Sequence, residues 1–374
     1  MSYEALLTEG YRQCAKLTWR YGTTYFWGAT LLPKPQRKHV HAIYALCRLA
    51  DDIVDLPNGH HLIKYNLDEV LPDPVEEHES SISHTSDGPS PDPDSIPTEP
   101  EPTLPDPDPV RPGVEWRASG PSASSARASV VRARLEAFAD RFRTSLTEGG
   151  DTDPVMAAVV HTVITCGIPR EYFDRFFGAM AMDLTTTRYE TWEDLRTYME
   201  GSAAVIGEMM LPVLEPTSQA ARAPARSLGL AFQLTNFIRD VDEDLDRGRV
   251  YLPQDDLRLF DVDLEQRQAT PEWRAFLAYE IERNRALYSF ADTGIAMLPP
   301  RSARCVGAAR VLYARILSEI ERNGYDVFSR RARVPTSRKA ATAARIMVTG
   351  PRTLKKRAEL YQRRSTTDVT QDTY

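Results

Sequence analysis

The chain has little of what marks a secreted, zinc-binding or membrane-spanning protein. Its four cysteines, Cys14, Cys47, Cys166 and Cys305, form no Cys-x-x-Cys pair, so the sequence indicates neither a zinc site nor a disulfide framework. Reduced thiols predict a cytoplasmic protein. The N-terminus lacks a charged segment followed by an apolar run, and no stretch approaches the ~20 apolar residues that a membrane-spanning helix needs. We therefore expect neither a signal peptide nor a transmembrane helix.

Patterns that would suggest a different fold or a nucleotide cofactor are also missing. The sequence contains no Gly-x-Gly-x-x-Gly loop, no useful length of strand-like alternation and no internal repeat. Helical periodicity instead runs through most of the chain and predicts an all-α protein. The expected helices cover residues 3–20, 34–56, 131–146, 153–166, 170–183, 192–212, 223–245, 271–291, 300–323 and 338–364.

Charge is distributed unevenly along the chain. The net charge is −7, yet residues 68–110 alone hold 13 Asp or Glu, 11 prolines and no Lys or Arg. Such a composition opposes collapse, so we expect 68–125 to be a disordered acidic insertion within one domain formed by 1–67 and 126–350, followed by a basic C-terminal tail, 351–374. The remainder is mildly basic, which suits an anionic substrate or membrane surface; we expect no nucleic acid partner.

Two stretches of the sequence each place two carboxylates on one helical face. At about 100° per residue, Asp51 and Asp55 share a face, and so do Asp240 and Asp244. Apolar neighbours predict that both helices are largely buried, where carboxylates repel one another unless a cation lies between them. One Asp-x-x-x-Asp motif is more often a solvated face, but two favour a cavity where Mg²⁺, with Mn²⁺ as the alternative, joins aspartates to a diphosphate.

Arg48 lies one helical turn before the first of these aspartates. It could bind phosphate oxygens with both guanidinium nitrogens, or it could simply pair with Asp51 or Asp52 on its own helix. We favour phosphate binding, because a buried arginine beside a metal-loaded site needs an anion.

The same residues carry a resemblance to the squalene/phytoene synthase family. The family's two signatures resemble two stretches of this chain: Arg48-x-x-Asp51-Asp52-Ile53-Val54-Asp55 and Gln233-x-x-Asn236-x-x-Arg239-Asp240-x-x-x-Asp244. Residues 246–253 are similar to the family's continuation, and 324–332 look like the C-terminal region of bacterial phytoene synthases. The likeness covers most of residues 10–345 apart from the insertion. It implies a single-domain helical bundle of the isoprenoid-synthase type around a central cavity.

The resemblance also assigns expected roles to individual residues. The implied metal ligands are Asp51, Asp55, Asn236, Asp240 and Asp244. The implied substrate-binding residues are Thr24, Tyr25, Arg48, Arg188, Gln233, Asn236, Arg239 and Arg249. The implied catalytic residues are Tyr198, Arg48 and Tyr251, with Tyr198 near the reacting carbons.

The reaction implied by the resemblance is the Mg²⁺-dependent head-to-head joining of two geranylgeranyl diphosphates to phytoene in carotenoid biosynthesis. It proceeds through a cyclopropyl diphosphate, releases diphosphate and needs no nicotinamide cofactor. The nearest alternative is a squalene or dehydrosqualene synthase that uses farnesyl diphosphate, and a chain-elongating or cyclising prenyl enzyme ranks lower. From another class, the chain could be a non-catalytic scaffold or assembly factor that retains the fold. The apolar substrate and product lead us to expect peripheral membrane contact.

Overall fold

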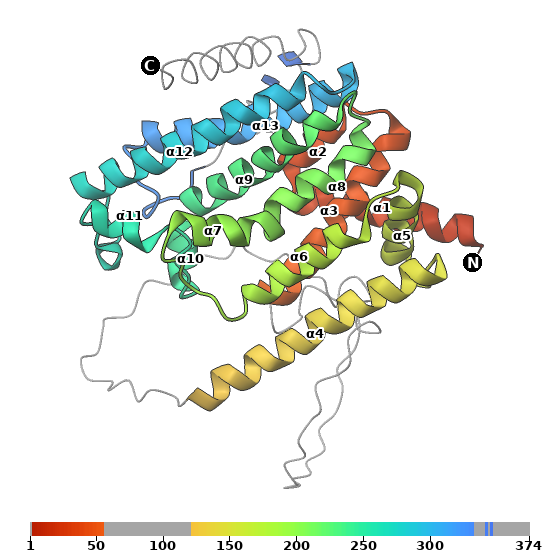
Figure 1. The fold of residues 1–374 in the computed structure, drawn as a ribbon, viewed down its shortest axis with the longest axis horizontal. Coiled ribbons are helices and arrows are strands. Elements are labelled where there is room, and N and C mark those ends of the chain that lie inside the picture. The colour runs from red at the N-terminus through yellow and green to blue at the C-terminus, as the bar shows by residue number, and fades with distance from the viewer. Residues whose placement is uncertain (1, 56–120, 333–340, 343–344, 347–374) are drawn as a thin grey trace, which may run out of the picture.

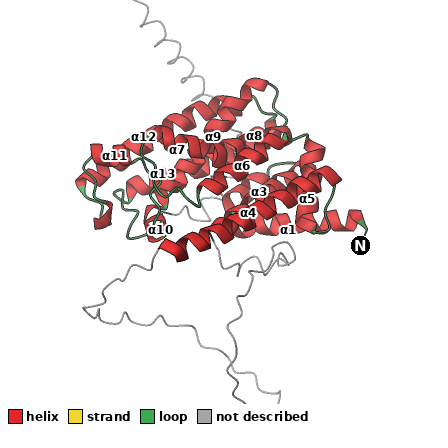
Figure 2. Cartoon of the chain, turned by 60° about the horizontal axis from the view of Figure 1, so that its bottom comes forward, coloured by secondary structure: helices red, strands yellow, loops and turns green. Residues whose placement is uncertain are grey.

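The computed structural model describes residues 2–55, 121–332, 341–342 and 345–346, without the side chains of 23–25 and 121–127. The described part is helical throughout, and its only bridge between extended segments is an isolated one (Figures 1 and 2). The α-helices are α1 (Tyr3–Tyr21), α2 (Thr23–Ala29), α3 (Lys34–Asp55), α4 (Pro121–Glu148), α5 (Pro154–Cys166), α6 (Arg170–Met182), α7 (Trp192–Met199), α8 (Val205–Leu214), α9 (Arg222–Arg239), α10 (Val241–Asp246), α11 (Gln254–Leu259), α12 (Pro271–Ile295) and α13 (Pro300–Arg322).

Local capping fixes where several of these helices begin. Asp153 accepts a hydrogen bond from the backbone N–H of Met156 at the start of α5, and the left-handed Gly167 ends that helix. Thr191 and Asp194 form a reciprocal capping box at the start of α7. These signals are local, so sequence periodicity and capping together place α5 within one residue of the predicted range.

Helix α9 lies between α8 on one side and α12 and α13 on the other (Figure 1). Its close approach to α8 depends on two glycines. A Cβ atom at Gly229 of α9 would lie 2.2 Å from the carbonyl oxygen of Ala203, and one at Gly207 of α8 would lie 2.2 Å from that of Ala225. Backbone-to-backbone contact at these points sets the distance between two helices that line the central cavity described below.

The two main clusters of buried residues meet where α8 contacts α9. One is built largely from α1, α3, α4, α5, α6 and α8, and the other from α7, α9, α12 and α13 together with the loop after α10. Burial of many apolar side chains on both sides is the main stabilising contribution to such a bundle.

The structure confirms the all-α prediction and corrects two of the predicted helices. Residues 223–245 do not form a continuous helix, because the backbone leaves the helical conformation at Asp240 (φ −104°, ψ 17°) between α9 and α10. A π-helical turn, Glu200–Ala204, also interrupts the predicted helix 192–212.

Several other expectations lie mostly outside the described residues. Helix α4 begins at Pro121, inside the last few residues of the predicted insertion, and the rest of that insertion is outside the described range. The predicted helix 338–364 and the tail 351–374 are also outside it, apart from 341–342 and 345–346. Within the described part, no helix is long and apolar enough to cross a membrane.

Candidate functional site

Helix α3 presents the first acidic motif at its C-terminal end. Asp52 is buried and forms an ion pair with Arg48, whose Nη1 also lies 3.3 Å from Oδ2 of Asp51. Helix α3 is largely buried, as expected, but the Asp51 side chain at this end is 47% exposed. Pairing within the helix, the alternative considered for Arg48, is therefore present. Its Nε atom is nevertheless buried without a hydrogen-bond partner among the described residues, which leaves one donor to spare.

The second acidic motif lies at the junction of α9 and α10. Asp240, at the break, accepts two 2.8 Å hydrogen bonds from Arg331 and is also paired with the adjacent Arg239. One turn earlier, Oδ1 of Asn236 is buried and has no partner among the described residues. An unsatisfied buried oxygen is costly and indicates a place for a donor or a cation.

The two motifs face each other across a short gap bridged by arginines. Nη1 of Arg249 lies 2.8 Å from Oδ1 of Asp55 on α3. Nη1 of Arg247 lies 3.9 Å from a carboxylate oxygen of Asp55 and 3.9 Å from one of Asp244 on α10. Two segments far apart in sequence therefore bring their carboxylates to the same guanidinium groups, at the end of the bundle where α10 and α11 lie (Figure 1).

A third segment adds an acid to the site at the end of α6. Asp183 is buried and accepts hydrogen bonds from the hydroxyl of Tyr198 at 2.7 Å and from that of Tyr251 at 3.3 Å. The sequence predicts no role for Asp183. The signal in the sequence is weak, because an acid at a helix end is common and its tyrosine partners become visible only in three dimensions.

Four aromatic rings stack beside this carboxylate. The ring of Tyr251 lies 4.0 Å from that of Phe237 at an interplanar angle of 10°, and Tyr198 and Tyr189 lie within 6.4 Å of this pair. An isolated parallel bridge between Arg188 and Val250 holds the two loops that carry Tyr189 and Tyr251 together. The stack therefore presents aromatic faces next to the acidic residues.

The electrostatics of the site show an excess of negative charge. Burial, followed by repulsion from Asp240, raises the pKa of Asp244 to about 7. Partial burial and repulsion from Asp55 raise the pKa of Asp51 above its usual value, and burial raises that of Asp183. A nearby cation would stabilise the ionised form of carboxylates whose pKa values are raised in this way.

The donor set suits a hard cation whose coordination is completed by a ligand. Among the described residues, no three His, Cys, Asp or Glu side chains are close enough to hold a metal ion by themselves. Mg²⁺ commonly takes only one or two carboxylates and fills its remaining positions with water and phosphate oxygens. The site offers oxygen donors from Asp55, Asp240, Asp244 and Asn236, and the orphaned amide oxygen of Asn236 fits this group.

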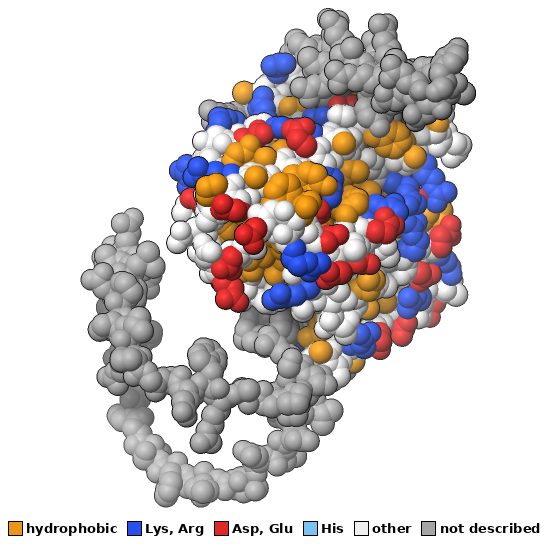
Figure 3. Space-filling model, turned by 60° about the vertical axis from the view of Figure 1, so that its left-hand side comes forward, with side chains coloured by type: hydrophobic (Ala, Val, Ile, Leu, Met, Phe, Trp, Pro, Cys, Tyr) orange, Lys and Arg blue, Asp and Glu red, His pale blue; other side chains and the backbone are white. Residues whose placement is uncertain are grey.

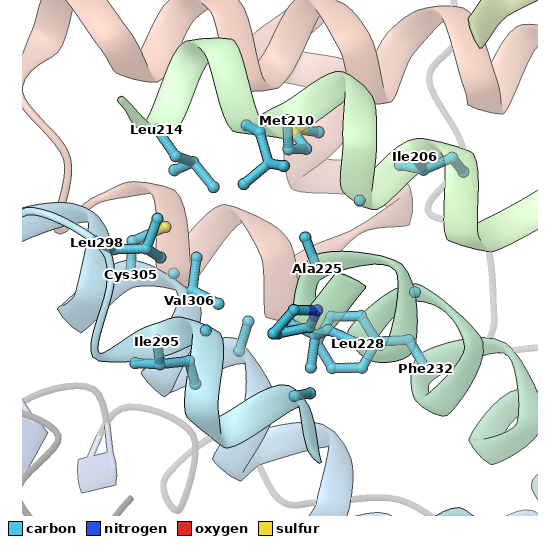
Figure 4. Close-up of a pocket in the computed structure, with 18 of the residues that line it drawn as sticks. Ile206, Met210, Leu214, Ala225, Leu228, Phe232, Ile295, Leu298, Cys305 and Val306 are labelled. Atoms are coloured by element: carbon cyan, nitrogen blue, oxygen red, sulfur yellow. The ribbon is translucent and has the colours of Figure 1, made fainter. Parts of the chain in front are cut away.

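An apolar cavity of about 240 Å³ begins at Gln233, one helical turn before Asn236, and runs along α9 (Figure 4). At this end it is lined by Gln233, a predicted substrate-binding residue, and by Tyr44, which lies one helical turn before Arg48. Leu214 and Leu298 line its far end. The remaining walls come from α2, α3, α8, α9, α12 and α13 and consist mainly of small or aliphatic side chains. Such a lining fits a hydrocarbon chain.

The other predicted residues are placed less favourably or lie outside the description. Arg188 is exposed, with its backbone beside Val250. Thr24 and Tyr25 belong to α2, but their side chains are outside the described set. Arg331, which contacts Asp240, was missed because nothing in its local sequence reveals that contact.

Comparison with known proteins gives three findings. Residues 19–75 and 120–338 match the squalene/phytoene synthase family. The chain is similar to 15-cis-phytoene synthase of Synechococcus elongatus, with 31% identity over 90% of this chain and 91% of that one. It is also 31% identical to phytoene synthase 1, chloroplastic, of Arabidopsis thaliana, over 90% of this chain and 66% of that protein. Among solved structures, a dehydrosqualene synthase in complex with ligand covers 92% of this chain and 98% of its own, with a TM-score of 0.66 and 20% identity, which shows a shared fold.

Proposed function

The chain belongs to the squalene/phytoene synthase family, and we propose that it joins two geranylgeranyl diphosphates head to head to form phytoene, releasing diphosphate. It is an enzyme of the prenyltransferase type, and its phytoene synthase relatives place it in carotenoid biosynthesis. The observation that carries the proposal is the meeting of Asp55 and Asp244 at Arg247, together with an apolar cavity lined by Tyr44 of α3 and Gln233 of α9. The charged residues suit the diphosphate group of a prenyl diphosphate, and the apolar cavity suits its hydrocarbon chain.

The charged residues would bind the diphosphate. Arg48 and Arg249 are the principal candidates, because both are partly buried and both point their guanidinium groups at the acidic cluster. Mg²⁺, when bound by the aspartates and Asn236, would neutralise the diphosphate and make it a better leaving group. Arg239 and Arg331 would supply further positive charge near Asp240.

The aromatic stack would stabilise the allylic cation left when diphosphate departs. Ring faces attract cations, and two rings of the stack contact Asp183, one of the acids of the site. Burial and the nearby Asp183 raise the pKa values of Tyr198 and Tyr251 above the ordinary tyrosine value. Both hydroxyls therefore remain protonated at neutral pH and act as donors, so we favour released diphosphate as the final proton acceptor.

The cavity would hold a prenyl chain away from water. Gln233 and Ala221, both on its wall, are separated along the chain by a length of about 18 Å at the rise of a helix, which suits an extended isoprenoid. A dry lining also protects the carbocation from capture by water. We propose a cytoplasmic protein that contacts membranes peripherally, because substrate and product are both lipids.

The deciding experiment is product analysis with purified protein. The protein is incubated with Mg²⁺ and labelled geranylgeranyl or farnesyl diphosphate, each with and without NADPH. We expect a C40 triene from geranylgeranyl diphosphate alone. A C30 product from farnesyl diphosphate only would replace the proposal by a squalene or dehydrosqualene synthase. Consumption of neither substrate by folded protein would favour the scaffold.

A further inference from the structure

We propose that the surface formed by the end of α1 and by α2, here called the α1–α2 face, is the site where this protein binds an anionic membrane. The inference deepens the proposed function by locating the membrane contact. It depends on that function for its purpose but not for its test.

The α1–α2 face presents an aromatic cluster at the surface. Trp19 is 52% exposed, and its ring makes edge contacts with Phe26 at 5.0 Å and Trp27 at 6.4 Å. Both of these α2 rings are partly exposed as well. Tryptophan is enriched where proteins meet the lipid headgroup region, because its ring is apolar and its N–H can still hydrogen-bond.

Charge on this part of the chain has one sign. Residues 10–50 contain seven Lys or Arg and no Asp or Glu, in a protein whose net charge is −7. Lys16 and Arg20 are exposed and lie one helical turn apart, on the same side of α1 as Trp19, and Lys34 is exposed at the start of α3. Cations that flank exposed tryptophans are the composition expected for binding to anionic lipid.

The opposite end of the bundle differs in its charge. Figure 3 views the end where α11 and α12 begin, and its hydrophobic side chains are interspersed with acidic and basic groups of both signs. That end also displays exposed apolar residues, Leu259 and Tyr279. Exposed apolar surface alone is thus not specific to the α1–α2 face, whereas its combination with Lys16, Arg20 and Lys34 is, since these cations form no ion pair within the described part of the chain.

The face also lies against the cavity wall. Gly28 of α2 lines the cavity, and a Cβ atom there would lie 3.3 Å from the carbonyl oxygen of Cys305 on α13. Arg37 donates hydrogen bonds of 2.8–3.1 Å to the carbonyls of Ala29, Thr30 and Leu32, which fixes the turn after α2. Helix α2 therefore contributes both to the cavity wall, through Gly28, and to the aromatic cluster. A lipid product would have only a short distance to travel from the cavity to the membrane.

A lipid surface fits this face better than a second copy of the chain. In a two-fold dimer the same patch meets itself, so the cations on one face would oppose those on the other. An anionic bilayer supplies the opposite charge and an apolar layer for the rings.

The test is co-sedimentation of the full chain with vesicles of phosphatidylglycerol and phosphatidylcholine, compared with pure phosphatidylcholine. We expect binding to the anionic vesicles. It should weaken roughly 25-fold or more in the Lys16→Glu/Arg20→Glu double variant, since each cation near the surface contributes about fivefold. Trp19→Ala should weaken binding severalfold and remove the part of the tryptophan quenching by brominated lipid that comes from position 19.

Matched controls sit at the other end of the molecule. Arg258→Glu/Arg274→Glu makes the same charge change on α11 and α12, and Leu259→Ala removes a 73% exposed side chain. Both should bind vesicles like the unaltered protein. No vesicle binding by the unaltered protein, or equal losses in test and control variants, would overturn the proposal. So would a change in oligomeric state in place of a change in binding, which would indicate an interface between copies.

Turnover of detergent-dispersed substrate separates this inference from the proposed function. The variants of the α1–α2 face should turn over such substrate at the unaltered rate. If the unaltered protein does not consume prenyl diphosphate, the proposed function is wrong. The vesicle experiment would still decide whether the α1–α2 face binds anionic membranes.

Discussion

Asp183→Asn tests whether the carboxylate that joins two tyrosines sets the geometry of the aromatic stack. Asp183 accepts hydrogen bonds from Tyr198 and Tyr251 through its two oxygens. Asparagine has almost the same shape but only one acceptor oxygen, and its NH₂ group cannot accept a hydroxyl proton. One of the two tyrosines must therefore lose its partner. Asp183 touches the rings but not the proposed reacting carbons, so we class it as a positioning residue.

The size of the effect follows from the type of bond that is lost. A hydrogen bond to a charged group contributes about 1.5–3 kcal/mol, and loss of that amount in the transition state slows a reaction roughly 10- to 150-fold. Burial already raises the pKa of Asp183, which means that its ionised form is held at a cost in the folded protein. The neutral amide removes that cost, so we expect little change in the free energy of unfolding and a loss in kcat with a smaller change in KM.

A double-mutant cycle with Tyr198→Phe is the decisive assay. If the carboxylate acts through Tyr198, the double variant should be little slower than the slower single variant, because the two residues form one unit. Glu190→Gln is a matched control, since this exposed acid lies on the same loop and its one ion pair within the described residues is with Arg258. Rate losses that simply multiply, or an unchanged kcat in Asp183→Asn, would refute the reasoning.

Three further outcomes are expected. Asp240→Asn or Asp51→Asn should reduce turnover by orders of magnitude through weaker metal binding while circular dichroism shows intact helicity; near-normal turnover in both would remove their assigned role. Deleting residues 70–120 should leave activity largely unchanged, and loss of activity in soluble, folded protein would show that the insertion participates. Burial, followed by the charge of Lys38, lowers the pKa of His39 to about 4. The unfolded chain binds that proton near pH 6.5, so stability due to His39 is complete above about 6.5 and falls toward pH 4. His39→Gln should therefore flatten the pH dependence of urea unfolding between pH 4 and 6.5 by up to about 1.4 kcal/mol per pH unit; an unchanged slope would contradict this.

The helices and the two acidic motifs could be predicted because their signals are local. Helical spacing alone places Asp51 with Asp55, and apolar periodicity marks α3 as a packed helix. The break at Asp240 could not be predicted in this way, since neither glycine nor proline occurs there. Its cause is tertiary: the carboxylate is held by Arg331 from beyond α13 as well as by Arg239.

The Asp183 interactions were missed for a related reason. An acid after an aromatic-rich helix gives no indication that two tyrosines, one from α7 and one from the loop after α10, will converge on it. Periodicity reports which face of a helix is buried but not which partner it meets. The parts of the site made by single helices were therefore accessible from sequence, and the parts made by loop-to-helix contacts were not.

The arginines explain how this site can hold so many acids and still bind an anion. Asp55 and Asp240 each lie near a guanidinium group from another segment, supplied by Arg249 and Arg331, and Asp244 lies near that of Arg247, three residues further along the chain. A diphosphate that arrives with divalent cations offers each partner a replacement, because phosphate oxygens can take the arginines while the metal takes the carboxylates. The exchange adds anion and cation together, so the local net charge changes little. This favours a site that accepts the two together over one that binds either alone.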